Sequence, residues 1–382
     1  MSTARMLLPL LLLALPCSAH AGQLVGIALD AKAELVDGDL HVLPHPPPDT
    51  AVFLEFDGAQ AREVARVSAP TGFQGPPEAL AISPDRRLAL VAGPQRIDPA
   101  DPARLVPADT LTVVDLAARP ARVVQKLSLG ATPGAVAIAP GGRTALVTHN
   151  GDDSVSVLDI TDGRARLAGR QSLGKDAGPL ALAFSPDGRR ALVSFPERAR
   201  IGVYAVERGR LVLPAIRELS AGVYPASLAW CSDDVAVVAN YGRVTGDVDT
   251  VSLLDLAGAA PRVVDTASVG PSPEGIACSP DGRHVAVALQ NMSTVPRDHP
   301  FHAAGSRVVL LRVEGGRLRP VAEASIGPWA QGVGFVDDAT LFAQSMGDRT
   351  LHIFRIEGDA LRVAAPIRFG EGAPAAFGMP AR

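Results

Sequence analysis

A segment of nearly fixed length recurs along this chain, and this repeat constrains the fold more than any other feature. Residues 133–160 read PGAVAIAPGGRTALVTHNGDDSVSVLDI, and residues 179–206, which begin 46 positions later, read PLALAFSPDGRRALVSFPERARIGVYAV. Further copies open at Pro77 and Pro273. Self-similarity with a period of about 40–50 residues is typical of propellers and solenoids, in which each repeat is one unit of supersecondary structure.

A turn of the Ser-Pro-Asp-Gly type lies within each copy, between two short apolar segments. Proline suits the second position of a type I turn, aspartate closes the turn, and glycine accepts the conformation at its exit. Two short strands joined in this way form a hairpin. Asp187 and Asp281 stand in two of these turns and are therefore predicted to be structural.

A segment of alternating apolar and polar residues follows each hairpin and is clearest in DSVSVLDI, residues 153–160. This alternation predicts a strand with two unlike faces. The motif begins at seven positions: Asp49, Asp109, Asp153, Ala199, Asp249, Ser306 and Arg349. With a fourth apolar run, such as residues 122–129, each unit has the four strands of one propeller blade. We therefore predict an all-β fold, a seven-bladed β-propeller with four antiparallel strands per blade, in preference to an all-β sandwich.

The hairpin motif occurs in full only six times, so one blade is expected to be divided between the two ends of the chain. Residues 374–380 resemble the start of an inner strand, and residues 24–36 can supply the missing strands. Closing the ring with N- and C-terminal segments removes exposed sheet edges. No shift in composition suggests another boundary, so we predict a single β-propeller domain over residues 22–382.

Residues 1–21 are predicted to be a cleavable signal peptide. Arg5 precedes an apolar run over residues 6–15, and Ala19-His20-Ala21 fits the small-residue pattern of a cleavage site after Ala21. The run is shorter than a membrane span requires. We expect export to the periplasm or the extracellular space, with a lipoprotein anchor at Cys17 as the alternative.

Charge and motif content exclude several classes of protein. The formal net charge of −4 argues against nucleic acid as a partner, because nucleic-acid-binding domains usually carry a strongly basic patch. No later apolar run is long enough to cross a bilayer, and we expect a monomer. The chain has no P-loop, dinucleotide fingerprint, HExxH, GxSxG or CxxCH motif, so we expect no cofactor.

The chain beyond residue 21 has two cysteines, Cys231 and Cys278, in the same motif of successive repeats but one register apart. A domain of this size can bury enough apolar surface without covalent cross-links. Because the geometry of a disulfide is demanding, two buried free thiols are the favoured prediction and a disulfide is the alternative.

Two segments after the hairpins, VTHNG at residues 147–151 and VANYG at residues 238–242, resemble the core of the YVTN repeat. That core continues into a strand like DSVSVLDI and shares the SPDG turn. The chain thus resembles the YVTN-type seven-bladed β-propellers, a broad group that includes propeller lactonases, over nearly all of residues 22–382. The resemblance implies the fold. It leaves the activity open, because the shared residues are structural ones.

Three insertions occur at one point of the repeat, between the second and third strands: residues 96–107, 243–248 and 293–305. Equivalent loops of all blades emerge on one face of a propeller. Insertions confined to one face of a repeat protein mark its binding face.

Polar and aromatic side chains at the ends of second strands and the starts of inner strands are expected to gather at the mouth of this face. Amides and carboxylates supply directional hydrogen bonds, and aromatic rings supply flat apolar faces. The predicted ligand-binding residues are Asn150, Tyr224, Asn240, Tyr241, Gln290, Asn291, Arg297, Trp329, Gln331 and Gln344. The alternative for each asparagine is a structural role in a turn or in left-handed backbone.

Two functions are compatible with these features, with a redox accessory role as a minor third. The favoured one is an exported propeller that binds a small polar ligand or another exported protein. The alternative is a lactonase-like hydrolase acting on a sugar-type lactone, with Glu78, Glu274 and His149 as the catalytic candidates that activate water. Glu78 and Glu274 share one repeat position, which favours a structural task. We predict that the three side chains do not converge on one pocket, whereas convergence with a raised carboxyl pKa would favour the hydrolase.

One loop carries a weak signal for metal. His299 and His302 have a spacing found among metal ligands, next to Asp298. The loop offers neither a cysteine nor a helical frame, so we expect no metal there. Arg243 and Arg297 lie on the same predicted face, where they either meet an anion or stay solvated.

Overall fold

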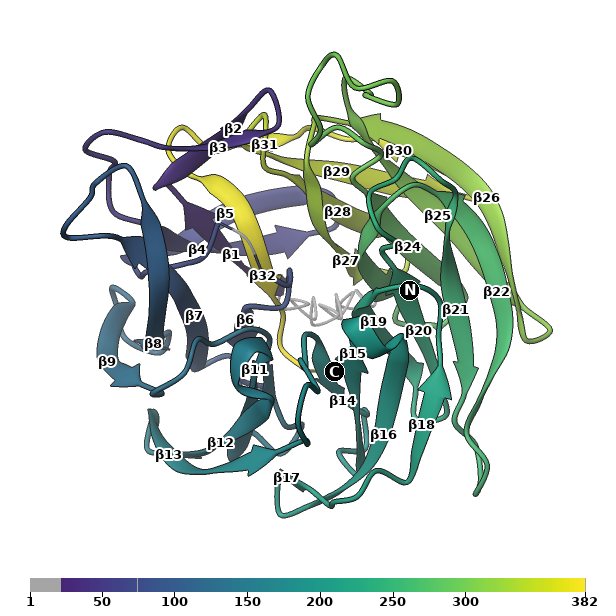
Figure 1. Ribbon diagram of the computed structural model, residues 1–382, viewed down its shortest axis with the longest axis horizontal. Helices are drawn as coiled ribbons and strands as arrows, with labels where there is room; N and C mark the ends of the chain where they lie inside the picture. The colour runs from purple at the N-terminus through teal and green to yellow at the C-terminus, as the bar shows by residue number, and fades with distance from the viewer. Residues whose placement is uncertain (1–21, 74, 382) are drawn as a thin grey trace, which may run out of the picture.

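The computed structural model describes residues 22–73 and 75–381. Within these residues, seven small antiparallel sheets surround a central axis and form the predicted seven-bladed β-propeller (Figure 1). The predicted signal peptide, residues 1–21, lies outside the described residues. Across the described part of the chain, no helix has the length and apolar character needed to cross a membrane.

Blades 2 to 7 are each built from consecutive strands, ordered from the axis outward. Blade 2 comprises β6 (Leu80–Ile82), β7 (Leu88–Ile97), β8 (Leu105–Asp115) and β9 (Arg122–Ser128). Blade 3 comprises β10 (Val136–Ile138), β11 (Thr144–His149), β12 (Ser154–Thr161) and β13 (Arg164–Ser172). Blade 4 comprises β14 (Leu182–Phe184), β15 (Arg190–Phe195), β16 (Arg200–Glu207), β17 (Arg210–Leu211) and β18 (Arg217–Ser220).

The next three blades repeat this order. Blade 5 comprises β19 (Pro225–Ser232), β20 (Val235–Asn240), β21 (Asp249–Asp255) and β22 (Arg262–Gly270). Blade 6 comprises β23 (Pro273–Cys278), β24 (His284–Leu289), β25 (Ser306–Glu314) and β26 (Arg317–Ile326). Blade 7 comprises β27 (Ala330–Asp337), β28 (Thr340–Ser345), β29 (Thr350–Glu357), β30 (Ala360–Val363) and β31 (Ile367–Arg368). Short 3-10 turns, η1 (Asn150–Asp152) and η2 (Pro196–Arg198), follow β11 and β15.

Blade 1 closes the ring with strands from both ends of the chain. Its innermost strand is β32 (Ala373–Gly378), which lies beside β1 (Gln23–Asp30); β4 (Thr50–Asp57) and β5 (Gln60–Ser68) complete the sheet (Figure 1). The antiparallel register places Phe377 opposite Ile27. The predicted closure is therefore confirmed, and the C-terminal segment supplies the inner strand.

The segment after β1 differs from the prediction. β1 ends at Asp30, and the next residues form a separate hairpin of β2 (Ala33–Val36) and β3 (Asp39–Val42), so residues 24–36 do not all belong to blade 1. This hairpin is inserted between the second and third strands of blade 1. It therefore occupies the same point of the repeat as the three predicted insertions. Because this blade is divided between the two termini, the spacing of the hairpin turns does not report this insertion, and the signal for it is the long interval between β1 and β4.

The Ser-Pro-Asp-Gly turns are closed by their own side chains. In blade 4 the Ser185 hydroxyl donates to the Asp187 carboxylate at 2.6 Å, and Asp187 accepts the backbone N–H of Arg189 at 3.0 Å. Gly188 has a φ of 69°, which glycine adopts without steric cost. Asp281 makes the same two kinds of bond in blade 6. The predicted structural role of both aspartates is confirmed.

A recurring aspartate at the start of the third strand anchors the loop that leads to the next blade. Asp153 accepts the backbone N–H groups of Asp176 at 2.7 Å and Gly178 at 2.9 Å. Asp249 accepts the N–H of Ser272 at 2.9 Å. Buried backbone donors need such partners. These bonds fix the segments from which the inner strands start, and so they position the side chains at the mouth.

Neighbouring blades pack face to face through apolar residues of their inner and middle strands. Leu192 and Ile201 of blade 4 pack against Leu228 and Val238 of blade 5, and all four are buried. Burying a side chain of this kind stabilises the fold by about 1.5–3 kcal/mol. The ring is held together by these contacts, because no continuous sheet connects the blades.

Cys231 and Cys278 form a disulfide with a Cα–Cα distance of 5.1 Å. The favoured prediction of free thiols is therefore wrong. Inner strands β19 and β23 lie side by side near the axis, so positions that differ by one in register come within bridging distance. The bond links blades 5 and 6 across 47 residues of chain, a loop for which a disulfide typically contributes about 2–4 kcal/mol.

A buried ion cluster fixes the base of the β2–β3 hairpin. The Lys32 ammonium donates to the carboxylates of Asp30 and Asp49 and to the carbonyl of Thr71, the last at 3.1 Å. Asp49 also accepts the backbone N–H groups of Ala31 at 2.9 Å and Thr71 at 3.0 Å. Burial raises the pKa of Asp30, and the attraction of Lys32 offsets this only in part.

Candidate functional site

The insertions gather on one face and touch one another. The backbone N–H of Arg297 donates to the Asp37 carboxylate at 2.7 Å, which joins the 293–305 insertion to the β2–β3 hairpin. The Phe301 ring of the same insertion lies against Gly246 of the 243–248 insertion. Leu105, from the insertion in blade 2, packs on the apolar cluster that contains Trp329. The expected common face is therefore present.

A cavity of about 410 Å³ lies under these insertions, at the end of the central channel that opens on the insertion face. We refer to it as the mouth cavity. Its walls come from the β2–β3 hairpin, the loops that enter the inner strands, and the ends of second strands. The residues lining it are Leu35, Gly38, Gly75, Pro76, Pro77, Leu180, Tyr224, Ala226, Tyr241, Glu274, Gln290, Thr294, Trp329 and Gln331. Five of the ten predicted ligand-binding residues are among them: Tyr224, Tyr241, Gln290, Trp329 and Gln331.

A chain of hydrogen bonds leads along one wall to Glu274. The Tyr241 hydroxyl donates to Gln290 Oε1 at 2.8 Å, and Thr294 Oγ1 donates to the same oxygen at 3.3 Å. Gln290 Nε2 in turn donates to the Glu274 carboxylate. The two acceptor bonds at Oε1 fix the orientation of the Gln290 amide, so one oxygen of Glu274 is held by a donor on the protein.

Glu78 reaches across the axis from the start of the inner strand of blade 2. Its Oε1 accepts a hydrogen bond from the Ser227 hydroxyl, which lies on β19 of blade 5. Below this bond the channel wall is mostly apolar, with Leu80, Leu182 and Leu228 among its residues. Glu78 therefore separates a polar cavity on the insertion face from an apolar channel toward the other face.

The two glutamates interact electrostatically. Burial raises the pKa of Glu78 to about 7. Burial, together with the charge of Glu78, raises the pKa of Glu274 to about 8. Glu274 lines the mouth cavity and Glu78 lines the channel below it, so this interaction does not contradict our expectation that the catalytic candidates do not converge on one pocket. A carboxyl that keeps its proton near neutral pH can donate or accept a proton at that pH.

His149 lies apart from the glutamates. Its ring nitrogens bond the Thr132 carbonyl at 3.0 Å and the Ser156 hydroxyl at 2.7 Å, both within blade 3. Burial lowers its pKa. The side chain is fully buried and does not line the mouth cavity. These contacts give His149 a structural role in its blade.

Four predicted amides are occupied by the backbone. Asn150 donates to the Gly178 carbonyl, and Asn291, in left-handed backbone, donates to the Gly305 carbonyl, both at 3.0 Å. Asn240 accepts the Gly222 N–H at 3.0 Å. Gln344 accepts the N–H of Gly332 and donates to the carbonyl of Ala376, which ties blade 7 to β32. None of the four lines the mouth cavity, and the contacts of the three asparagines are those of the structural role given as their alternative.

Two of the lining aromatic residues have unusual backbone conformations. Tyr224 has a φ of 52° and Trp329 a φ of 60°, a region that bulky residues rarely adopt. Trp329 is held edge-on against Phe73 with ring centroids 4.8 Å apart. Such strained positions cluster at ligand-binding sites, where surrounding contacts hold them.

Two oxygen atoms near the mouth cavity are buried without a hydrogen-bond partner among the described residues: Gln331 Oε1 and Glu78 Oε2. The whole Gln331 residue is only 2% exposed. A buried acceptor that lacks a donor costs about 1–3 kcal/mol. Such atoms in a native structure call for an explanation, and a ligand that supplies donors is one.

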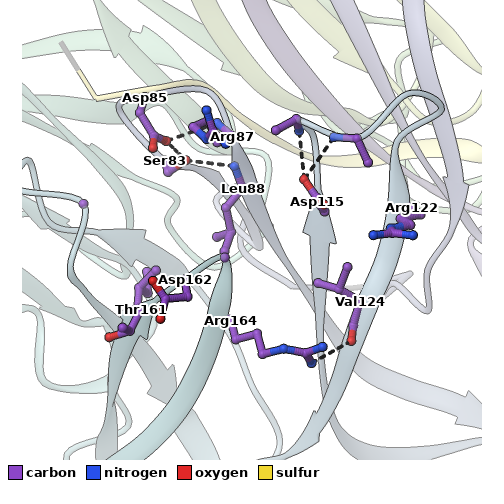
Figure 2. A pocket seen from close by; sticks show the side chains of 15 residues that line it. Ser83, Asp85, Arg87, Leu88, Asp115, Arg122, Val124, Thr161, Asp162 and Arg164 are labelled. Carbon is purple, nitrogen blue, oxygen red and sulfur yellow. Dashed lines mark hydrogen bonds between the residues drawn. The ribbon is translucent and has the colours of Figure 1, made fainter.

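A concavity of about 720 Å³, larger than the mouth cavity, lies elsewhere, in a groove between blades 2 and 3 (Figure 2). It is lined by turns that join first to second and third to fourth strands, so it lies on the face opposite the insertions. Several of its polar groups already bond one another or nearby backbone. Asp85 accepts from Ser83 and from the Arg87 N–H, and Arg164 donates to the Val124 carbonyl (Figure 2). We therefore place the candidate site at the mouth cavity.

The histidine loop shows no metal-binding geometry. His302 Nδ1 bonds the Val295 carbonyl at 3.0 Å, and His299 Nδ1 accepts the Phe301 N–H at 3.3 Å. Over the described ranges, no group of three or more His, Cys, Asp and Glu side chains is arranged to hold a metal ion.

Sequence reasoning missed three contributors to the site: the β2–β3 hairpin, Ser227 and Thr294. The long interval between β1 and β4 was a usable signal for the hairpin. Ser227 and Thr294 had no usable signal, because single hydroxyl residues are common in every repeat.

Comparisons with known proteins support the fold. No family model matches the chain, and no curated protein matches its sequence. Among solved structures, a putative 6-phosphogluconolactonase from Bacteroides uniformis ATCC 8492 is 15% identical, with a TM-score of 0.70 over 94% of this chain and 100% of the other. The periplasmic gluconolactonase of Pseudomonas aeruginosa is 17% identical, with a TM-score of 0.64 over 94% and 99%.

A third similar structure has no assigned activity. It is a functionally unknown protein from Desulfotomaculum acetoxidans DSM 771, 15% identical, with a TM-score of 0.67 over 93% of this chain and 98% of the other. These likenesses establish the fold. They do not test the YVTN-type resemblance, which stays a prediction.

Proposed function

We propose that this protein binds a small polar molecule that bears hydrogen-bond donors in the mouth cavity. The observation that carries the proposal is a pair of buried acceptor oxygens that have no donor among the described residues: Gln331 Oε1 in the cavity wall and Glu78 Oε2 in the channel that adjoins it. The chain of bonds from Tyr241 through Gln290 to Glu274 supplies a third, oriented acceptor group. A sugar or polyol would satisfy these oxygens and lay its apolar faces on the aromatic rings.

The cavity suits a small molecule better than a protein partner. Its volume of about 410 Å³ lies within the range of small-molecule sites. The β2–β3 hairpin narrows access to it, since Leu35 and Gly38 form part of the wall. A recessed cavity under a hairpin limits contact with a flat protein surface.

Binding of neutral polyols is tested by calorimetry and thermal shift on the purified protein. We expect sorbitol and hexoses to bind, and Tyr241→Phe to weaken binding about three- to tenfold, because it removes one of the two bonds that orient Gln290. Tyr204→Phe, in the core of blade 4, is the matched control and leaves binding unchanged. If the wild type and Tyr241→Phe bind with equal affinity, the ligand does not contact the wall that carries Gln290.

A second candidate function, lactone hydrolysis, is favoured by the coupled carboxyl pair. With pKa values of about 7 and about 8, Glu78 and Glu274 can exchange a proton with a reacting water near neutral pH. Three of the similar solved structures are described as lactonases or putative lactonases, which makes this chemistry a candidate without assigning it.

A screen of sugar-type lactones distinguishes hydrolysis from binding alone. If the pair is catalytic, Glu78→Gln and Glu274→Gln each lower kcat about 100-fold or more. Glu314→Gln, an exposed glutamate of blade 6, leaves kcat unchanged. If lactones bind but are not hydrolysed, the protein binds these ligands without catalysing their hydrolysis.

We also propose that the protein is exported and belongs with the YVTN-type propellers. The disulfide supports export, because such bonds persist in oxidising compartments. The predicted signal peptide at residues 1–21 also supports export. One neighbour is itself described as periplasmic.

A further inference from the structure

The walls of the mouth cavity carry an acidic side chain without a matching basic one. Among the described residues that line it, Glu274 is the one acidic residue and none is a lysine, arginine or histidine, and Glu78 lies in the channel below. Arg243, an arginine on this face, is engaged: it pairs with Glu197 at 3.0 Å and stacks over the Tyr224 ring at 5.3 Å. Buried carboxylates are usually paired with a cation, so this pair lacks one.

Elsewhere in this chain, a buried pair of carboxylates is paired with a lysine. Under the β2–β3 hairpin, the Lys32 ammonium lies between Asp30 and Asp49 and donates its third bond to the Thr71 carbonyl. That acceptor set consists of two carboxylates and one neutral oxygen.

The mouth cavity offers an acceptor set of the same kind without the lysine. Glu274 and Gln331 line it, with a carboxylate and a neutral amide oxygen, and the Glu78 carboxylate adjoins it from the channel below. Gln331 and Glu78 each have an oxygen with no donor among the described residues. An ammonium group has three donors and no acceptor, so it matches these groups once the two carboxyls have released their protons. The rings of Tyr241 and Trp329 add faces that attract a cation.

We propose that the mouth cavity selects small polyol-like ligands that carry a cationic amino group, and that it disfavours phosphorylated and carboxylated ones. The inference rests on the proposed function and specifies its ligand class. The ammonium occupies the place among Glu274, Glu78 and Gln331 that Lys32 occupies among its own acceptors. A phosphate or carboxylate at that place would meet like charge and no donor other than amide and hydroxyl groups.

A metal ion is the competing occupant. A metal site in proteins normally recruits more than two carboxylates or imidazoles when it holds the ion without a substrate. The described residues show no group of three such side chains. An amino group needs only the three acceptors present, so the observations favour it.

The test compares three ligands with one six-carbon skeleton: glucamine, sorbitol and gluconate, which end in an ammonium, a hydroxyl and a carboxylate. Affinities are measured by isothermal titration calorimetry with the purified chain at pH 8. We expect glucamine to bind about tenfold or more tightly than sorbitol, and gluconate more weakly than sorbitol. In Glu274→Gln, we expect the preference for glucamine to shrink to about threefold or less while sorbitol affinity is retained. Glu314→Gln is the matched control and keeps the preference.

The outcomes separate this inference from the proposed function. Equal affinities for the three ligands, or tightest binding of gluconate, overturn the inference and leave polyol binding in place. No binding of any of the three overturns both. A thermal shift with calcium or magnesium chloride that Glu274→Gln abolishes, without glucamine binding, overturns the inference in favour of a metal site.

Discussion

At pH 9 the Glu274→Gln variant is expected to be more stable than the wild type by about 3 kcal/mol, whereas at pH 5 the two should differ by less than about 1 kcal/mol. The pKa of Glu274 is raised to about 8 in the folded protein, from 4.5 in the unfolded chain. The folded state therefore favours the protonated carboxyl. Stability is unaffected below pH 4.5 and is lost as the pH rises toward 8, where the unfolded chain has released its proton and the folded chain still holds it.

The size of the effect follows from the shift. A rise from 4.5 to about 8 corresponds to roughly 5 kcal/mol. Glu274 is not fully inaccessible, and water in the cavity screens its charge, so we expect about 3 kcal/mol. Glutamine cannot ionise and still accepts the bond from Gln290. The gain at pH 9 corresponds to about 4 °C in Tm for a chain of this size.

The measurement is thermal unfolding of both proteins from pH 5 to pH 9. Glu314→Gln, an exposed position on the same blade, serves as the control and should follow the wild type. Glu78→Gln should show the same trend with a smaller gain, because the pKa of Glu78 is raised to about 7. A difference between Glu274→Gln and wild type that stays constant with pH would contradict the raised pKa.

Replacing Lys32 with Met is expected to lower the free energy of unfolding by about 3–5 kcal/mol. The ammonium is bonded to Asp30 and Asp49, and their side chains are 0% and 5% exposed. Without Lys32, two buried carboxylates face each other, and the Thr71 carbonyl loses a donor. The base of the β2–β3 hairpin then loosens, so ligand affinity at the mouth cavity should fall as well.

The chain offers a matched control for this change. Lys126→Met, on the exposed surface of β9, should leave Tm within about 1 °C. In the triple variant Asp30→Asn, Lys32→Met, Asp49→Asn, stability should partly return, because the unpaired charges are removed. Equal Tm values for Lys32→Met and Lys126→Met would show that the cluster contributes nothing to stability.

The turn and strand patterns predicted the fold because they are local. Ser185 and Asp187 close their turn within five residues of chain, so the motif carries its own geometry. The alternation in DSVSVLDI reports which face of β12 is buried. Seven copies of such units form a ring, and this does not depend on which side chains lie at its mouth.

The mouth cavity was predictable only in part. Position in the repeat correctly placed Tyr241, Gln290 and Gln331 at one end of the ring. It could not distinguish them from Asn240 or Gln344, which occupy similar positions but accept backbone N–H groups of Gly222 and Gly332. Whether an amide side chain faces the axis or bonds a loop depends on the neighbouring strands. The repeat pattern of a single chain does not specify those contacts.

The sequence by itself determined the seven four-stranded blades and the face that carries the insertions. Both follow from periodicities within about 50 residues. The tertiary structure alone decided that Cys231 bonds Cys278, that Glu78 reaches Ser227 across the axis, and that its charge raises the pKa of Glu274. These contacts join residues from different blades. Their strength depends on distance and burial at the axis, which exist only once the ring has closed.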